Sequence, residues 1–320
     1  MNILLVGLGG MGACHYNNYQ HIEDANVVAC VGMGEKDLAA AKAWGVPLYE
    51  TVEAACRNEQ IDLVDVCTPT HLHKPLVLDA IAQGKHVICE KPLALKLADA
   101  QEMYAKAEEK GVQLYVAQVL QFTREIETLR EVVADARYGK PLDGCFERLT
   151  ACPKWSAGGW LFDKEKSGLL PFDLHIHDLD VIVSMFGKPD DVLFTECAGP
   201  GKAYSEQYRF MYVWHSGMNV CAEAAWFNAA IPFTARWRVY FERGMLVCDH
   251  NGVTGYAADG TVTQFDVSES VTVDCVINLG RSGWILRELT HLLGCAKKGE
   301  PSALVPKQRI LDVLEIIEKI

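Results

Sequence analysis

The stretch NILLVGLGGMG at residues 2–12 decides the fold. Its first five residues form an apolar run, which is typical of a strand buried on both faces. A GxGxxG motif follows at once and begins a helix, the context in which such a motif indicates a dinucleotide-binding turn. Gly7 would permit the tight turn, Gly9 would let a pyrophosphate approach the backbone, and Gly12 would allow close packing of helix on strand. The alternative is a strand–helix turn that binds no ligand. The residues expected at the phosphates, on the positive end of the helix, are Gly7, Gly9, Gly10, Met11 and Gly12.

The same alternation of strand and helix continues through the first 120 residues. Short apolar runs are separated by segments with helical spacing, which predicts right-handed crossovers and a parallel, doubly wound α/β sheet. The further strands are expected at 27–31, 63–67, 86–89 and 114–117, and the helices at 11–19, 37–44, 52–57, 74–83 and 97–110.

After Gln121 the pattern changes to alternating strands joined by tight turns. We therefore predict a dinucleotide-binding domain at residues 1–120 and a substrate-binding and oligomerisation domain at 121–320. The second domain is expected to be α+β, with an open and mainly antiparallel sheet, and its terminal helix could pack back on the first domain. Strands are expected at 144–150, 192–197, 206–215, 218–226, 234–241 and 244–249, and helices at 124–138, 173–186, 284–298 and 306–319.

Composition excludes several classes of protein. The chain has 320 residues and a net charge of −12, which argues against binding nucleic acid or an anionic membrane surface. No apolar stretch approaches the roughly 18 residues needed to cross a bilayer. Twelve cysteines are present without CxxC spacing or an export signal, so we expect a cytoplasmic protein with reduced, mostly core-packing thiols. Cys14, in the first turn of the phosphate-binding helix, is the one thiol expected to react.

The end of the second strand leaves the choice of cofactor open. An acidic residue commonly stands there to bind the ribose hydroxyls of NAD, but this chain has Gly32. No arginine replaces it to bind a 2′-phosphate, and Lys36 is more simply a solvated surface residue. The sequence is therefore compatible with either NAD or NADP.

Two later strands end in segments rich in functional groups. Residues 65–73 (DVCTPTHLH) and 84–92 (GKHVICEKP) would both lie at the carboxyl edge of the parallel sheet, where ligands of such folds bind. The residues expected to contact the cofactor there, besides Gly32, are Thr68, Pro69, Thr70, His73, Glu90 and Lys91.

Taken with Trp160, Ser167-Gly168, Asp173 and His177, these motifs resemble the glucose–fructose oxidoreductase / inositol dehydrogenase (Gfo/Idh/MocA) family along essentially the whole chain. The resemblance implies a Rossmann domain followed by a domain built on an open antiparallel sheet. It also implies NAD(P)-dependent hydride transfer to or from a hydroxyl or ketone of a sugar, inositol or sugar derivative.

The family pattern places the catalytic group at Lys91, Asp173 and His177. A helix over 173–186 would put Asp173, His177 and Asp180 on one face. His177 would act as acid and base near neutral pH. Lys91 would hold the hydroxyl oxygen of the substrate and stabilise negative charge on it, and Asp173 would orient the His177 ring. Without the resemblance, Asp173 reads equally as a helix cap and His177 as a core histidine. The expected substrate-binding residues are Lys91, Gln118, Trp160, Asp173 and His177.

Two departures from the family pattern concern the substrate pocket. His175 replaces the glycine of an Asp-x-Gly-x-His motif, and Ser167-Gly168-Leu169 stands where consecutive glycines are common. His175 and His177 would point to opposite sides of a helix, so we expect no metal site.

Three functions remain compatible with the residues. The first is the oxidoreductase just described, the second an NAD-dependent glycoside hydrolase that oxidises its sugar transiently, and the third a non-catalytic sensor of NAD(P) or sugar. The expected partners are a small polyol and further copies of the chain, as a homodimer or homotetramer through the C-terminal sheet.

Overall fold

The apolar runs of the N-terminal part form sheet A of the computed structural model, which describes residues 1–275 and 280–320. All its neighbouring strands are parallel, in the order β3-β2-β1-β4-β5-β6. The strand order reverses between β1 and β4, which places a ligand-binding crevice at their carboxyl ends. The strands are β1 (Asn2–Val6), β2 (Asn26–Val31), β3 (Leu48–Tyr49), β4 (Leu63–Val66), β5 (His86–Glu90) and β6 (Leu114–Ala117).

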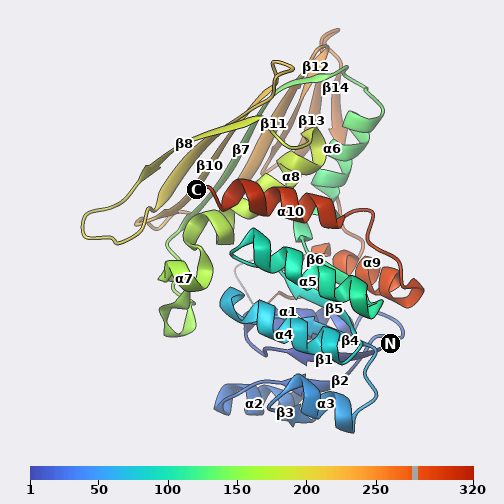
Figure 1. The fold of residues 1–320 in the computed structure, drawn as a ribbon. Coiled ribbons are helices and arrows are strands. Elements are labelled where there is room, and N and C mark those ends of the chain that lie inside the picture. The colour runs from blue at the N-terminus through green and yellow to red at the C-terminus, as the bar shows by residue number, and fades with distance from the viewer. Residues whose placement is uncertain (276–279) are drawn as a thin grey trace. The chain divides into compact units, whose positions relative to one another are not determined.

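Helices follow these strands, as the sequence predicts, and α4 and α5 pack side by side (Figure 1). Two short 3₁₀ turns, Thr70–Leu72 and Val119–Phe122, follow β4 and β6. The helices are α1 (Gly10–Tyr19), α2 (Glu35–Trp44), α3 (Val52–Asn58), α4 (His73–Ala82) and α5 (Leu97–Lys110). The α/β fold class with a doubly wound parallel sheet is confirmed.

The chain divides into two compact units, and their limits differ from a single cut at residue 120. The first unit is Met1–Phe122 with Glu269–Leu314, and the second is Thr123–Ser268 with Glu315–Ile320. Helix α9 (Trp284–Lys298) belongs to the first unit because its apolar face packs on α1 and on the turn after β6. The hydroxyl of Tyr115 also donates to the carbonyl of Glu300 at 2.7 Å.

A disulfide between Cys14 of α1 and Cys275 adds a covalent tie within the first unit. The prediction that Cys14 is a reactive free thiol is therefore wrong. No local sequence pattern could indicate this disulfide, because Cys275 lies 261 residues from Cys14.

The second unit is built on sheet B, an eight-stranded sheet in the order β14-β13-β12-β11-β7-β10-β9-β8. Its neighbouring strands are antiparallel except for β7 and β10, so the predicted mainly antiparallel sheet is confirmed. The strands are β7 (Pro141–Ala151), β8 (Asp191–Cys197), β9 (Gln207–Val213), β10 (Asn219–Phe227), β11 (Thr234–Phe241), β12 (Gly244–Asp249), β13 (Gly252–Ala257) and β14 (Val262–Phe265).

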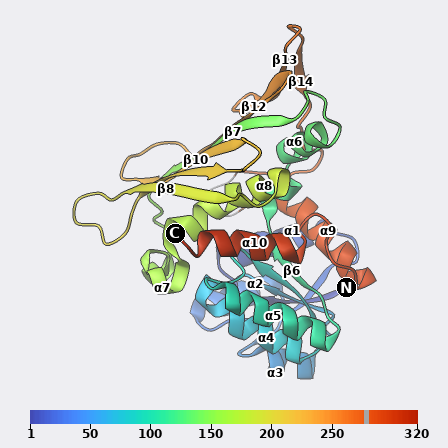
Figure 2. The same ribbon diagram turned by 45° about the horizontal axis from the view of Figure 1, so that its top comes forward.

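One face of sheet B is covered and the other is open. Side chains alternate along each strand, so Phe210 is buried while the next residue, Met211, is 40% exposed. Helix α8 packs on β7 at the covered face, and the turn that precedes α8 packs on β10 (Figure 2). The helices with residues in this unit are α6 (Arg124–Ala134), α7 (Lys164–Ser167), α8 (Ile176–Phe186) and, shared with the first unit, α10 (Lys307–Ile317).

A search for membrane-spanning helices among the described residues finds none of the required length and apolarity.

Candidate functional site

The glycine turn after β1 has the geometry that its sequence predicts. Gly7 adopts a φ of +88°, a conformation that residues with a side chain rarely adopt, and its N–H donates to the carbonyl of Val31 at 2.9 Å. A Cβ on Gly12 would collide with the carbonyl oxygen of Gly7, so helix and turn touch through their backbones. At Gly9, by contrast, no described atom lies within 4 Å of the position a Cβ would take. The turn therefore leaves no space for a side chain at Gly7 or Gly12, whereas Gly9 faces open space.

The N-terminus of α1 and the end of β4 together suit a phosphate-bearing ligand. Gly9 caps α1 without a side-chain hydrogen bond, and the first N–H groups of a helix have no partner within it. The Thr68 methyl group lies only 2.8 Å from where a Cβ on Gly7 would sit. The hydroxyl oxygen of Thr68 is buried and has no hydrogen-bond partner among the described residues. An unsatisfied hydroxyl beside open backbone fits a dinucleotide, because both would gain partners from it.

A carboxylate does occupy the end of β2, although the residue that follows the strand is Gly32. Atoms of the Asp37 side chain lie 2.7–2.9 Å from where a Cβ on Gly32 would sit. Asp37 comes from the first turn of α2, so it fills the space in which an acidic side chain at position 32 would begin. The ribose-binding acid was expected at the strand end itself, so Asp37 was not among the predicted residues. The signal was an aspartate in the first turn of the next helix, six residues beyond the last residue of the strand.

His73 ties together the turns after β4 and β5. Its Nδ1 lies 2.8 Å from the carbonyl of Pro92, and its Nε2 lies 2.9 Å from the carbonyl of Thr68. Burial lowers the pKa of His73, so the neutral ring donates to one of these carbonyls at a time. The Lys91–Pro92 bond is cis. His73 is 1% exposed, so the structure gives it a role in holding the turns that carry Thr68 and Lys91.

A buried network of ionisable groups lies behind the glycine turn, and the sequence analysis did not find it. His15 of α1 is fully buried; its Nδ1 lies 2.8 Å from Asp65 of β4, and its Nε2 lies 3.1 Å from Glu90 of β5. Tyr19 donates its hydroxyl to Asp65 at 2.7 Å, and the sulfur of Cys67 lies 3.3 Å from His15. The signal was Asp65 itself, since a carboxylate in a strand buried on both faces requires a partner.

The charge state of this network follows from its geometry. Burial alone would lower the pKa of His15, but electrostatic interaction and hydrogen bonding with Cys67 and Asp65 outweigh it and raise that pKa well above 6.5. Burial raises the pKa of Cys67, which keeps it a thiol, so Asp65 is the effective counterion. Donor atoms of His15, Asp65 and Cys67 lie within 4.8 Å of one another, close enough for a metal ion. A protonated imidazole and a neutral thiol are poor metal ligands, so we interpret the group as a hydrogen-bonded ion network.

Glu90 and Gln118 are both turned inward in the first unit. One carboxylate oxygen of Glu90 faces His15, and the other accepts the N–H of Lys91 at 3.1 Å. Gln118, after β6, is 2% exposed. Lys91 lies between Glu90 and the cis bond and is partly exposed, so the buried network holds its backbone in place.

In the second unit, Asp173 and His177 stand out by exposure. Within the fully described range Pro171–Val183, they are partly exposed while every other residue is buried. The prediction that a regular α-helix contains both residues is wrong, however. Pro171–His175 forms a π-helical turn that leads into α8, so the regular 3.6-residue repeat does not hold across this pair. Such turns are frequent at functional sites.

Two contacts fix this element on sheet B. Arg148 of β7 donates two hydrogen bonds, each of 2.8 Å, to the carboxylate of Asp178 on α8. His175, which replaces the motif glycine, points into the core: its ring stacks on Phe210 at 3.9 Å, and its Nε2 lies 2.6 Å from the hydroxyl of Tyr212. Burial, aided by the charge of Arg148, lowers the pKa of His175 to about 3.

The segment before this element carries the second departure from the family pattern. Gly168 and Leu169 both adopt left-handed conformations, with φ of +70° and +63°. Leucine is unfavourable there, which explains why a glycine would suit the position. Trp160 is partly buried in the preceding turn, while Trp155 is 46% exposed.

The predicted catalytic residues thus belong to different units. Lys91 lies in the first unit, and Asp173 and His177 lie in the second. Within the first unit the fold brings together the glycine turn, Thr68 and the His73 tie.

Comparison with known proteins accounts for both units. A family described as an oxidoreductase family with an NAD-binding Rossmann fold matches residues 1–118, and a GFO/IDH/MocA C-terminal domain matches residues 126–247. D-apiose dehydrogenase from Paraburkholderia graminis is 34% identical over 185 residues, which cover 57% of this chain and 49% of that protein. Myo-inositol 2-dehydrogenase from Thermotoga maritima is 31% identical over 198 residues, which cover 61% of this chain and 58% of that protein. The chain thus spans about half the length of the curated relatives it matches.

Among solved structures, an oxidoreductase from Agrobacterium radiobacter in complex with NAD⁺, L-tartaric acid and magnesium superposes with a TM-score of 0.84 at 18% identity. That match covers 99% of this chain and 94% of that one, which shows a shared fold. The two matched domains, in the order found here, establish that the chain belongs to the GFO/IDH/MocA oxidoreductase family, with an NAD-binding Rossmann domain.

Proposed function

We propose that the protein transfers a hydride between a nicotinamide dinucleotide and a hydroxyl or ketone of a sugar, an inositol or a sugar derivative. The observation that carries this proposal is the glycine turn itself, where the Thr68 side chain lies against Gly7 with its hydroxyl unsatisfied and where Gly9 faces open space. The names of the relatives, D-apiose dehydrogenase and myo-inositol 2-dehydrogenase, support a polyol as substrate. In this proposal residues 1–120 bind the cofactor, and residues 121–320 bind the substrate together with Lys91 and Gln118 of the first domain.

The chain's own residues divide the work as follows. The N–H groups at the start of α1 and the Thr68 hydroxyl bind the cofactor, whose nicotinamide, when bound, supplies the hydride chemistry. Lys91 holds the reacting oxygen of the substrate and stabilises negative charge on it. His177 takes the hydroxyl proton during oxidation and returns it during reduction, and Asp173 orients the ring. Trp160 and Gln118 line the sugar.

Separate replacement of Lys91 and His177 tests these roles. We expect Lys91→Ala and His177→Ala each to lower kcat by about 100-fold or more, while NAD⁺ affinity measured by calorimetry stays nearly unchanged. Lys110→Ala and His250→Ala are matched controls, because both residues are exposed. Full turnover in either Lys91→Ala or His177→Ala would contradict the assignment.

We further propose that the cofactor is NAD rather than NADP, because of Asp37. Its carboxylate stands at the end of β2, where it can accept hydrogen bonds from ribose hydroxyls and would repel a 2′-phosphate. Asp37→Ser should shift the ratio of NAD⁺ to NADP⁺ affinity toward NADP⁺ by about tenfold, which corresponds to about 1.4 kcal/mol. Glu35→Gln, a charge change in the same exposed turn, should leave the ratio unchanged. An unchanged ratio in Asp37→Ser would refute the proposal.

The open face of sheet B supports self-association, and we propose that a second copy of the chain packs on it. Large apolar side chains stand exposed there: Leu193 by 60%, Tyr240 by 49% and Tyr256 by 43%. Exposed large apolar side chains on one sheet face are typical of an interface. Sedimentation should show a dimer or tetramer that Leu193→Asp dissociates and that Leu38→Asp, in the first unit, does not. A wild-type monomer at micromolar concentration would contradict this.

For the compartment we propose the cytoplasm, where a nicotinamide cofactor is continuously recycled. The Cys14–Cys275 disulfide is the feature that a reducing compartment would disfavour. Fractionation of the source cell tests the location. Thiol titration of the denatured, unreduced protein tests the bond, with ten free thiols expected if it is intact.

A further inference from the structure

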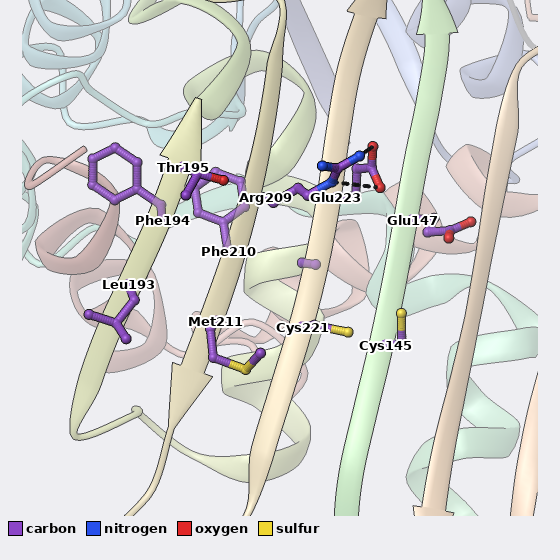
Figure 3. A pocket seen from close by; sticks show the side chains of 11 residues that line it. Cys145, Glu147, Leu193, Phe194, Thr195, Arg209, Phe210, Met211, Cys221 and Glu223 are labelled. Carbon is purple, nitrogen blue, oxygen red and sulfur yellow. Dashed lines mark hydrogen bonds and ion pairs between the residues drawn. The ribbon is translucent and has the colours of Figure 1, made fainter. Parts of the chain in front are cut away.

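Three sulfur-bearing side chains form a row across neighbouring strands on the open face of sheet B. Met211 of β9 is paired with Cys221 of β10, and Cys221 is paired in turn with Cys145 of β7. Residues paired directly across strands project from the same face of a sheet, so all three sulfurs lie on one side. Figure 3 shows them together among the residues that line a shallow hollow of about 340 Å³.

The two thiols are close enough to act together. Cys145 and Cys221 occupy directly paired positions on adjacent strands, and both are partly exposed. Interaction with Cys145 lowers the pKa of Cys221, and Arg238 on the next strand lowers it further, against burial and the charge of Asp143. The same interaction raises the pKa of Cys145, so the first proton of the pair leaves from Cys221. The pair therefore gives up its first proton more readily than an isolated cysteine, and the thiolate is the form that binds metals.

The oxygen donors near the row are already engaged. Glu223 pairs with Arg209 at 3.4 Å, and Glu147 pairs with Arg236. Their carboxylates would otherwise provide the oxygen ligands that harder metal ions prefer. The available donors in the row are two thiols and one thioether, the latter 40% exposed.

We propose that Cys145, Cys221 and Met211 form a binding site for copper(I). Soft thiolate and thioether ligands select this ion. Binding would release one proton from each thiol to solvent and form two Cu–S bonds, with the Met211 sulfur as a third ligand. The resulting complex carries one negative charge, which Arg238, paired with Cys145 in the adjacent strand, offsets. The site uses none of the residues assigned to hydride transfer, so it stands independently of the proposed activity. Because Met211 is paired with Leu193, the site lies on the sheet face proposed for self-association and would stand at that interface.

Anaerobic titration of the full-length protein with copper(I) tests this site, with ascorbate as reductant and a chromophoric copper(I) chelator as competitor. We expect the wild type to bind one more copper per chain than the double variant Cys145→Ser/Cys221→Ser. Met211→Leu should keep the stoichiometry and weaken the affinity by about tenfold or more. Cys197→Ser is the matched control, because Cys197 is an exposed free cysteine outside the row, and it should bind as the wild type does.

Copper K-edge absorption provides a second, structural readout on the same samples. The wild type should show sulfur ligation that the double variant lacks, and circular dichroism should show that both are folded. Equal stoichiometry and affinity in the wild type and the double variant would overturn the proposal. Ligation of the wild-type copper by nitrogen and oxygen alone would also overturn it.

Discussion

Two histidines, one in each unit, are both 0% exposed, yet the structure gives them opposite charge states. In the first unit, His15 lies between the carboxylates of Asp65 and Glu90, which hold its proton. In the second, His175 stacks on Phe210 and faces a tyrosine hydroxyl, so burial removes its proton. Burial alone therefore does not determine whether a histidine is charged. The groups that face its two nitrogens do.

The comparison also explains what each histidine does for its site. His15 links α1, β4 and β5, the three elements that carry the glycine turn, Thr68 and Lys91. The hydrogen bonds of the charged His15 to Asp65 and Glu90 hold these three elements together at the carboxyl edge of sheet A. His175 instead fills space under the π-helical turn, and so leaves Asp173 and His177 as the partly exposed residues of that element.

Replacing each histidine by phenylalanine should give the largest difference between the two sites. His15→Phe removes the cation between two buried carboxylates, and we expect it to lower the free energy of unfolding by about 3–5 kcal/mol. His175→Phe should cost only about 1–3 kcal/mol, chiefly because the Tyr212 hydroxyl loses its partner. Urea denaturation of both variants measures the difference. Equal losses would show that the two sites do not differ in charge.

The pH dependence of stability should separate the two histidines in direction. The folded-state pKa of His175 is about 3, so between pH 6.5 and 3 the unfolded chain binds a proton that the folded chain does not. Its contribution therefore falls as pH falls, by about 2 kcal/mol at pH 5. The folded-state pKa of His15 lies above 6.5, so its contribution is full below pH 6.5 and is lost as pH rises through that raised value.

Urea denaturation from pH 5 to 9 checks these signs. His175→Phe should flatten the acid side of the profile, and His15→Phe should flatten the alkaline side. The reverse assignment, or no change in either variant, would mean that the charge states inferred from the contacts are wrong.

The smallest effect is expected when both partners of the second site are replaced. His175→Phe/Tyr212→Phe leaves no unpaired polar group from this contact, so its stability should lie within about 1 kcal/mol of the wild type. A double variant less stable than His175→Phe alone would indicate that Tyr212 has a second partner.

Much of the fold could be predicted because local sequence patterns, such as apolar runs and glycine turns, indicate it. The apolar runs at 2–6 and 63–67 and the glycine turn between strand and helix indicate a doubly wound sheet without any long-range information. The two-residue strand β3 and the short, glycine- and threonine-containing β13 and β14 carry too little periodicity to be recognised. The placement of Glu269–Leu314 with the first unit depends on tertiary packing, which no local pattern reveals.

The sites divide in the same way. Motif spacing indicates Lys91, Asp173 and His177, but their roles remain predictions. Asp37 was missed because its carboxylate comes from the first turn of α2 and not from the end of the strand. The network around His15 was missed because its members come from elements far apart in the sequence. The π-helical turn at Pro171–His175 was missed because the pattern there is equally compatible with a regular helix.

The central claim is that this chain oxidises a polyol at the expense of NAD⁺. Following the NADH absorbance band while the protein is incubated with NAD⁺ and a panel of sugars, inositols and sugar acids tests it most directly. We predict NADH formed in equal amount to a ketone product for at least one polyol. NAD⁺ binding without NADH from any member of the panel, or product formed without net NADH, would contradict the claim.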